Sequence, residues 1–225
     1  MNKKAVIFDM DGVIIDSEPF WQEAQKESLL QYGITLSTQE CERLTMGKRI
    51  DEIARIWCHA YHIEIDPKVL EKNILTRLCI RISTRGQAME GLANIIQFFK
   101  ESGYQIGLAT SSTHTVINAV FNRLNLWGSF DVICSAENEQ FGKPHPDVYL
   151  TAARKLGISP HECIVIEDSF TGLSAAKNAE MTTYLVAANC NEVQFLSADG
   201  HYENLTTLKR FFAHELMLSN DCAVA

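Results

Sequence analysis

Two carboxylates stand one residue apart near the start of the chain, where Asp9 and Asp11 follow an apolar run and Gly12 comes directly after them. Glycine adopts backbone angles that other residues avoid, so the chain can turn there while the two carboxylates stay close together. Like charges this close repel each other, which favours either a shared proton or a divalent cation between them. Asp and Gly are also common turn residues, so this stretch taken alone is equally consistent with a simple turn.

Three later stretches also combine apolar runs with residues able to hold a phosphate or a metal. They are Thr110-Ser111-Ser112, Gly142-Lys143-Pro144-His145-Pro146 and Glu167-Asp168. Carboxylates and a hydroxyl favour a hard cation with oxygen ligands, such as Mg²⁺ keeping some of its waters. Lys143 adds a cation on a loop stiffened by two prolines, and the free N–H groups of a helix that begins near Thr113 suit an anion. A metal, a cation, a hydroxyl and a helix end together describe a phosphate site.

The pattern of apolar residues predicts a fold that brings these stretches together. Short apolar runs at 5–8, 105–109, 130–134, 163–166 and 182–186 are predicted strands. Helical segments at 92–99, 116–124, 146–156 and 173–179 separate the later strands, and a last helix covers 205–216. Strands separated by helices form right-handed βαβ units, so we predict a doubly wound α/β domain with a parallel sheet. In such sheets the ligand crevice lies at the carboxyl ends of the strands, where the four acids and the Thr110 hydroxyl are expected to meet.

The segment between the first two predicted strands is helical throughout. Apolar residues recur with a period near 3.6 over 20–32, 38–46, 50–61 and 67–82. We therefore predict a small all-helical cap domain at 17–85, inserted into a core domain made of 1–16 and 86–225. An insertion that leaves from the active edge of a sheet is positioned to act as a lid. Asp16 or Ser17 is expected to cap the first helix of this segment.

The composition excludes several classes of function. The chain has 225 residues, of which 46% are hydrophobic and 21% charged, as in ordinary globular proteins. Its formal net charge of -8 argues against a nucleic-acid or anionic-membrane surface, so neither partner is expected. No apolar run is long enough to cross a bilayer, and the amino-terminal stretch does not read as a secretion signal. Seven cysteines without a Cys-x-x-Cys pair suit reduced thiols, so we expect a cytoplasmic protein, and we expect it to be a monomer.

Four motifs, in this order, resemble those of the haloacid dehalogenase (HAD) superfamily. They are Asp-Met-Asp-Gly-Val at 9–13, Ala-Thr-Ser-Ser at 109–112, Gly-Lys-Pro-His-Pro at 142–146 and Glu-Asp-Ser-Phe-Thr-Gly at 167–172. The helical insertion after the first motif resembles the cap of the group with four cap helices, and the resemblance covers nearly the whole chain. Within that group the chain is similar to the β-phosphoglucomutase-like sugar phosphatases, especially the 2-deoxyglucose-6-phosphate and hexitol-phosphate phosphatases of bacteria.

The resemblance implies a Mg²⁺-dependent phosphatase that hydrolyses small sugar or sugar-alcohol phosphates. Asp9 is implied to be the nucleophile that forms an aspartyl-phosphate. Asp11 is implied to protonate the leaving sugar oxygen and then to activate water, while its backbone carbonyl binds the metal. Thr110, Ser111 and Lys143 are implied to hold the phosphate. The implied metal ligands are Asp9, Asp11, Glu167 and Asp168, with Glu167 acting directly or through water.

Other polar residues near the motifs have simpler explanations. His114, His145 and Asp16 are expected to have structural roles in loops and caps, and Ser169 and Gly172 are expected to shape the start of a helix. None of these residues is therefore a candidate for catalysis.

Residues of the cap are expected to select the sugar. The candidates are Glu18, Trp21, Lys48 and Arg49, which lie at the connector to the cap or in a glycine-containing turn between cap helices. Lys48 and Arg49 are equally consistent with the solvated start of a helix. The mutase relatives have a histidine at the position of Trp21, and this departure favours hydrolysis over a mutase reaction.

Two other functions use similar residues. A phosphosugar mutase of the β-phosphoglucomutase type would use the same four motifs, but it needs a bisphosphate activator and releases little free phosphate. A phospho-receiver module also surrounds a phosphoaccepting Asp with acids, a Thr and a Lys, but the cap insertion and Asp11 as a ready acid/base disfavour it. Haloalkanoate dehalogenation is disfavoured because those members of the superfamily lack the equivalents of Asp11 and of the metal-binding acids.

Overall fold

A six-stranded parallel sheet forms the centre of the computed structural model, which describes residues 3–221. The strands are β1 (Ala5–Phe8), β2 (Gln105–Thr110), β3 (Val132–Ser135), β4 (Cys163–Glu167), β5 (Thr182–Val186) and β6 (Gly200–Tyr202). Their order in the sheet is β3-β2-β1-β4-β5-β6, and every neighbouring pair is parallel. The predicted doubly wound α/β fold is confirmed, with β6 as an additional edge strand.

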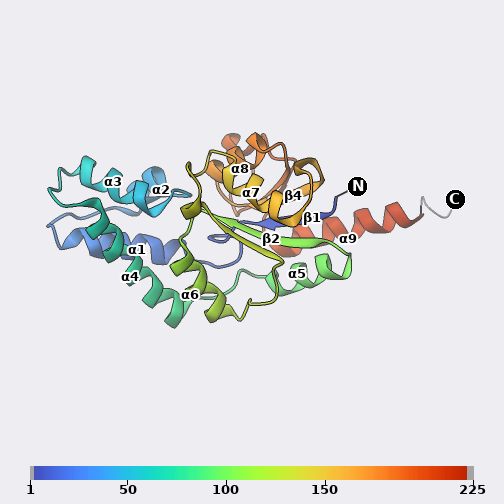
Figure 1. Ribbon diagram of the computed structural model, residues 1–225, viewed down its shortest axis with the longest axis horizontal. Helices are drawn as coiled ribbons and strands as arrows, with labels where there is room; N and C mark the ends of the chain where they lie inside the picture. Colours follow the sequence, from blue (N-terminus) through green and yellow to red (C-terminus); the bar gives the residue numbers. More distant parts are fainter. Residues whose placement is uncertain (1–2, 222–225) are drawn as a thin grey trace.

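Helices cover both faces of this sheet (Figure 1). One face carries α5 (Leu92–Glu101), α6 (His114–Leu124) and α9 (Leu205–Asp221), and the other carries α7 (Asp147–Leu156) and α8 (Phe170–Asn178). Side chains alternate along a strand, so Val6 and Phe8 of β1 join the apolar core on the first side, and Ala5 and Ile7 join the core on the second. Burial on both faces explains why β1 is a continuous apolar run.

Four further helices lie between β1 and β2 in the sequence, and we call them the cap. They are α1 (Glu18–Leu30), α2 (Thr38–Thr45), α3 (Ile50–Ala60) and α4 (Pro67–Arg85), and they lie together beside the sheet (Figure 1). The helix α4 packs on α1 and α3 and also on α6. Trp57, Leu70 and Ile74 are completely buried between the cap helices, and the Arg81–Glu23 ion pair joins α4 to α1 at the surface. All four helices were predicted, each to within three residues at either end.

The register of the sheet determines which polar residues meet. Phe8 of β1 pairs with Leu108 of β2 and with Ile166 of β4. The next residue after β1 is Asp9, which therefore lies between the carboxyl ends of β2 and β4. The candidate catalytic residues therefore lie at the edge of the sheet that faces the cap.

The sequence predicts that no segment crosses a membrane and that the cysteines are free thiols. None of the helices within residues 3–221 is both long and apolar enough to cross a membrane. Six cysteines within this range have free thiols, as expected, and Cys222 lies outside the described residues.

Candidate active site

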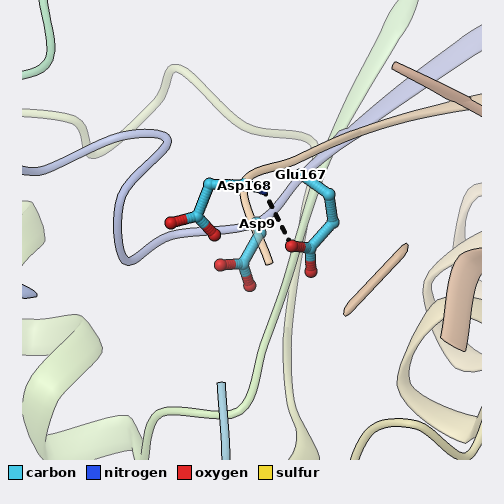
Figure 2. A group of neighbouring side chains, drawn as sticks. All are labelled: Asp9, Glu167 and Asp168. Carbon is cyan, nitrogen blue, oxygen red and sulfur yellow. Dashed lines mark hydrogen bonds between the residues drawn. The ribbon is translucent and has the colours of Figure 1, made fainter. Parts of the chain in front are cut away.

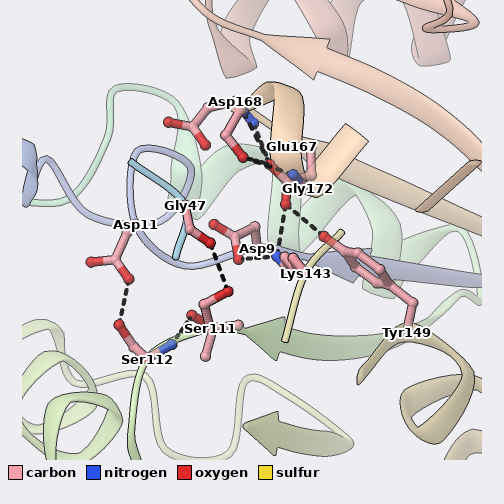
Figure 3. Close-up of polar contacts among 12 residues, drawn as sticks. Asp9, Asp11, Gly47, Ser111, Ser112, Lys143, Tyr149, Glu167, Asp168 and Gly172 are labelled. Carbon is pink, nitrogen blue, oxygen red and sulfur yellow. Dashed lines mark hydrogen bonds and ion pairs between the residues drawn. The ribbon is translucent and has the colours of Figure 1, made fainter. Parts of the chain in front are cut away.

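A pocket lies between the carboxyl ends of the strands and the cap (Figure 3). From the core it is lined by Asp9, Asp11, Thr110, Ser111, Ser112, Lys143, Asp168 and Ser169. From the cap it is lined by Glu18, Trp21, Gln25, Thr45, Met46, Gly47, Lys48 and Ile53. All the candidate catalytic, phosphate-binding, metal-binding and specificity residues therefore line one pocket, except Glu167, which lies just behind the pocket wall, and Arg49.

The Lys143 ammonium joins two acids beneath the pocket. Its Nζ lies 2.6 Å from Asp9 Oδ1 and 2.7 Å from Glu167 Oε1, and all three residues are buried. Burial alone would lower the pKa of Lys143, but the two adjoining carboxylates raise it above its ordinary value, so the amine stays charged. Burial, together with the charges of Glu167 and Asp11, raises the pKa of Asp9 to about 7, although Lys143 lowers it.

Glu167 is already fully engaged by hydrogen-bond donors. Its Oε1 accepts bonds of 2.7 Å from Lys143 Nζ and from the Tyr149 hydroxyl. Its Oε2 accepts from the Asp168 N–H at 3.0 Å, and from the N–H and hydroxyl of Ser169 at 3.1 and 3.0 Å. A carboxylate offers about four lone-pair positions, so five donors leave none for a metal. This arrangement argues against direct coordination of a metal by Glu167, and a bridging water would have to replace one of the five donors.

Asp9, Glu167 and Asp168 form a cluster of acids in which one oxygen from each carboxylate lies within 4.8 Å of the other two (Figure 2). Gly12 makes room for this cluster, because its φ is +78° and a Cβ atom there would lie 1.9 Å from Asp168 Oδ2. Burial and the neighbouring acids raise the pKa of Asp168 well above its ordinary value. Among the described residues, one ammonium thus faces three carboxylates. The surplus of negative charge and the oxygen donors fit a Mg²⁺ ion held by Asp9 and Asp168.

Three donors fix the side chain of Asp11. Its Oδ1 accepts a 2.5 Å bond from the Ser17 hydroxyl and a 2.9 Å bond from the Trp21 indole N–H, and its Oδ2 accepts a 2.7 Å bond from the Ser112 hydroxyl. Ser17 occupies the N-cap position of α1, but its side chain makes no capping bond because it faces Asp11. The prediction that Asp16 or Ser17 caps this helix is therefore wrong.

The end of β2 supplies hydroxyl groups to the pocket. Thr110 Oγ1 accepts from the Ser112 N–H at 3.1 Å. The Ser111 hydroxyl donates to the Gly47 carbonyl at 3.0 Å and so connects the core to the turn between α2 and α3. Thr110 and Ser111 therefore both line the pocket, with Ser111 also bonded to the cap, and their contacts with a phosphate stay a prediction.

The start of α6, expected to suit an anion, carries one contact from the protein itself. The His114 N–H donates a 2.9 Å bond to the Glu137 carboxylate, so one of the amides of the helix start is bonded to an acid of the loop after β3. The expected role of this helix end in phosphate binding stays a prediction. The side chain of His114 contacts Asn138 at 2.7 Å, in keeping with a structural role.

Two further residues near the motifs have the structural roles expected of them. The His145 ring lies 3.0 Å from the Asp147 carboxylate at the start of α7. The Ser169 hydroxyl accepts a 3.0 Å bond from the Gly172 N–H and caps α8. Because of this cap, α8 begins at Phe170, three residues before the predicted start.

The four candidate specificity residues of the cap do not share one position. Glu18, Trp21 and Lys48 line the pocket. Arg49 does not: its guanidinium lies 2.9 Å from the Asp51 carboxylate and donates to the Glu139 carbonyl at 3.1 Å. In this arrangement Arg49 connects the cap to the loop before Lys143, and it does not line the pocket.

Tyr149 is the main functional residue that the sequence analysis missed. Its side chain is completely buried on α7, where its hydroxyl donates to Glu167 and its ring lies 4.7 Å from Lys143 Nζ. A buried tyrosine hydroxyl requires a polar partner, and its position six residues after Lys143 was the available signal. Ser17 and Ser112 were likewise not assigned to Asp11, because the sequence does not show which way a hydroxyl points.

A parallel sheet with acids at its carboxyl edge, a buried lysine bonded to two of them and an inserted helical cap together define a hydrolase of the haloacid dehalogenase type. The family model of haloacid dehalogenase-like hydrolases matches residues 3–180, and the chain belongs to this family. With named phosphatases among its relatives, the chain is an enzyme of the phosphatase class.

Three relatives show how far the similarity extends. Hexitol phosphatase B of Escherichia coli K12 is 35% identical over 208 residues, which cover 91% of this chain and 93% of that protein. Beta-phosphoglucomutase of Bacillus subtilis is 32% identical over 184 residues, covering 79% and 80% respectively. The crystal structure of beta-phosphoglucomutase from Clostridium difficile matches 99% of this chain and 100% of that one, with a TM-score of 0.82 and 26% identity.

Proposed function

We infer that the protein is a Mg²⁺-dependent phosphatase that hydrolyses hexose or hexitol phosphates, such as 2-deoxyglucose 6-phosphate, through an aspartyl-phosphate on Asp9. The observation that carries this inference is the meeting of Asp9, Asp11, Thr110, Lys143 and Asp168 in one pocket at the edge of the sheet. Similarity to hexitol phosphatase B supports the choice of substrate class.

Asp9, Asp168 and the backbone carbonyl of Asp11 are the proposed metal ligands, with Glu167 behind them. When bound, Mg²⁺ supplies positive charge that lets an anionic nucleophile approach an anionic phosphate. On the chain itself, Lys143 fixes the direction of the Asp9 carboxylate through the 2.6 Å bond to Oδ1. The other oxygen of Asp9 is thereby left to attack.

In the first step, this Asp9 oxygen forms a bond to phosphorus while the bond between phosphorus and the sugar oxygen breaks. Asp11 donates its proton to the departing oxygen, so the sugar leaves as an alcohol. The phosphate oxygens are contacted by Thr110, Ser111 and Lys143, which stabilise the negative charge of the transferring group.

In the second step, water attacks phosphorus and Asp11 takes up the proton that the water loses. The bond between phosphorus and Asp9 breaks, which releases phosphate and restores both carboxyl groups to their starting states. The three donors around Asp11 keep its side chain in one place for both proton transfers.

Residues 17–85 are proposed to act as a cap domain over a core made of 1–16 and 86–225. Side-chain hydrogen bonds beside the pocket cross between these parts from Ser111 to Gly47, from Arg49 to Glu139, and from Ser17 and Trp21 to Asp11. Ser17 and Trp21 lie next to the connector, whereas the bonds made by Ser111 and Arg49 must break if the cap is to separate from the core and admit a substrate. Closing them again would exclude bulk water from the reaction.

The proposal also includes action in the cytoplasm, as a monomer that binds neither nucleic acid nor membrane. The net charge of -8 supports the absence of polyanionic partners. The free thiols of the described residues are consistent with a reducing compartment.

A phosphosugar mutase is the second candidate, because beta-phosphoglucomutase of Bacillus subtilis is also a relative. A mutase must keep water away from the phosphorylated Asp9 while a bound bisphosphate changes its orientation in the site. The two reactions separate in one assay: β-glucose 1-phosphate is incubated with and without a hexose bisphosphate, and glucose 6-phosphate and free phosphate are both measured. The phosphatase proposal requires free phosphate as the main product.

Asp168→Ala tests the metal site. We expect Mg²⁺ affinity to fall by at least about 100-fold. Removing a residue that only hydrogen-bonds to a metal ligand already lowers metal affinity about 10–100-fold, and loss of a ligand itself should cost more. Calorimetric titration of Mg²⁺ gives the affinity, and phosphate release at increasing Mg²⁺ gives the dependence of the rate. Asp16→Ala, which removes an exposed carboxylate close to the same motif, is the matched control. An unchanged Mg²⁺ titration in Asp168→Ala would remove this residue from the metal site.

A further inference from the structure

Most polar groups that the cap presents to the pocket are already bonded within the protein. The Trp21 indole N–H donates to Asp11. Gln25 donates to the Trp21 carbonyl at 3.2 Å and accepts a 2.7 Å bond from the Trp57 indole. The Thr45 hydroxyl donates to the Cys41 carbonyl at 2.7 Å. These groups shape the pocket, but they have no free donor or acceptor with which to bind the leaving group, which is the sugar or sugar alcohol.

Two side chains of the cap retain free polar atoms toward the pocket. Glu18 accepts a single 3.2 Å bond at Oε1 from Gln22, and within residues 3–218 its Oε2 has no hydrogen-bond donor. Lys48 also lines the pocket, and over the same residues its Nζ forms neither a hydrogen bond nor an ion pair. An acceptor and a donor are therefore both available on the cap side, and they come from α1 and from the turn before α3.

The charges around Glu18 disfavour an anion there. Burial is the main cause that raises the pKa of Glu18 to about 7, the bond from Gln22 opposes the rise, and the charges of Asp11, Glu42 and Asp16 add to it. Lys143 is already paired with two carboxylates, and Arg49 is turned away from the pocket. A second phosphate or a carboxylate on the substrate would find Lys48 as its only free cation among the described residues lining the pocket.

We propose that Glu18 and Lys48 select substrates whose leaving group is an uncharged polyol, with Glu18 accepting a hydroxyl and excluding a second anionic group. The proposal rests on the proposed function, since it concerns the alcohol released by the same site. A polyol hydroxyl can donate to Glu18 Oε2, and a neighbouring one can accept from Lys48. A carboxylate or an ionised second phosphate can accept from Lys48, but it has no hydrogen to donate to Glu18, and the acids around Glu18 repel it.

The test compares three phosphate esters on the wild type and on Glu18→Gln. They are a hexitol 6-phosphate with an uncharged leaving group, phosphoglycolate with a carboxylate, and a hexose 1,6-bisphosphate with a second phosphate. The kcat/KM for phosphate release is measured for each in the presence of Mg²⁺. Glu42→Gln is the matched control, because Glu42 is exposed, accepts from the same Gln22 side chain at 3.4 Å and does not line the pocket.

We expect the wild type to prefer the hexitol phosphate over both anionic esters by at least about 100-fold. In Glu18→Gln this preference should fall by at least about tenfold, mainly through a higher KM for the hexitol phosphate, and in Glu42→Gln it should stay within about twofold. A wild type that prefers either anionic ester overturns the proposal without any variant. So does a change of less than threefold in Glu18→Gln.

Failure of this inference is distinguishable from failure of the proposed function. p-Nitrophenyl phosphate carries no polyol, so wild-type release of phosphate from it reports the phosphatase chemistry alone. Release from this compound without the expected hexitol preference overturns only the role of Glu18 and Lys48. No Mg²⁺-dependent release from any of the four esters overturns the proposed function itself.

Discussion

Asp9→Asn is expected to lower kcat for phosphate release by at least about 10⁴-fold, the loss seen when a nucleophile or its partner is removed from an active site. The amide has the shape of the carboxylate but is a poor nucleophile, so no aspartyl-phosphate can form. Its oxygen can still accept the bond from Lys143, and Glu167 still balances the ammonium charge. The fold should therefore survive. Phosphate release, circular dichroism and thermal unfolding measured on the same sample separate the two effects.

Asp147→Asn provides the control for this variant. Asp147 lies on the neighbouring α7, where its carboxylate contacts His145 and does not line the pocket. The rate of this control should stay within about twofold of the wild type, as for surface substitutions away from the site. If Asp9→Asn releases phosphate at near the wild-type rate, Asp9 is not the nucleophile and the mechanism is wrong.

Lys143→Met is expected to have the largest combined effect on stability and activity. Removing the ammonium leaves the Asp9 and Glu167 carboxylates buried without a counter-charge, and breaking a buried ion pair in this way typically costs about 3–5 kcal/mol of unfolding free energy. For a chain of this length the loss corresponds to a fall in Tm of about 10 °C. Phosphate release should also fall sharply, because the transferring group loses its fixed cation.

The destabilisation in Lys143→Met should depend on pH. Burial already raises the pKa of Asp9 to about 7, and without Lys143 this pKa rises further. An acid whose pKa is raised in the folded protein loses stability as pH increases from its unfolded pKa to its folded pKa. The fall in Tm should therefore be larger at pH 8 than at pH 5, where Asp9 can take up a proton. Lys72→Met, at an exposed position on α4, should show little change at either pH. An equal Tm for Lys143→Met and wild type at pH 8 would contradict the buried pairing.

The strands and helices that position the site could be predicted from the sequence, because each has a continuous or periodic apolar pattern. β1 is a clear case, since its four residues are all completely buried. The edge strand β6 was missed because Gly200-His201-Tyr202 is short and only partly buried, so it has no such pattern. The extra turn at the start of α8 was missed because it depends on one capping bond from Ser169.

The composition of the site could also be predicted, but not the direction of its side chains. The order of the strand ends places Asp9, Thr110 and Glu167 at one edge, whichever rotamer each adopts. That Glu167 faces Lys143 and not the pocket depends on five donor bonds, one of which comes from Tyr149 on another element. Arg49 is similar: its neighbour Asp51 turns it from the pocket, and nothing in the spacing of residues shows this contact.

Phosphate release from a panel of hexose, hexitol, pentose and triose phosphates, with Mg²⁺ and with a chelator, tests the central claim most directly. We predict release with Mg²⁺ that favours the hexose and hexitol phosphates, and a loss of at least about 100-fold when the chelator removes the metal. Release that is the same with chelator would contradict the metal-dependent mechanism. No release from any member, together with isomerisation of β-glucose 1-phosphate when a bisphosphate is added, would show that the protein is a mutase.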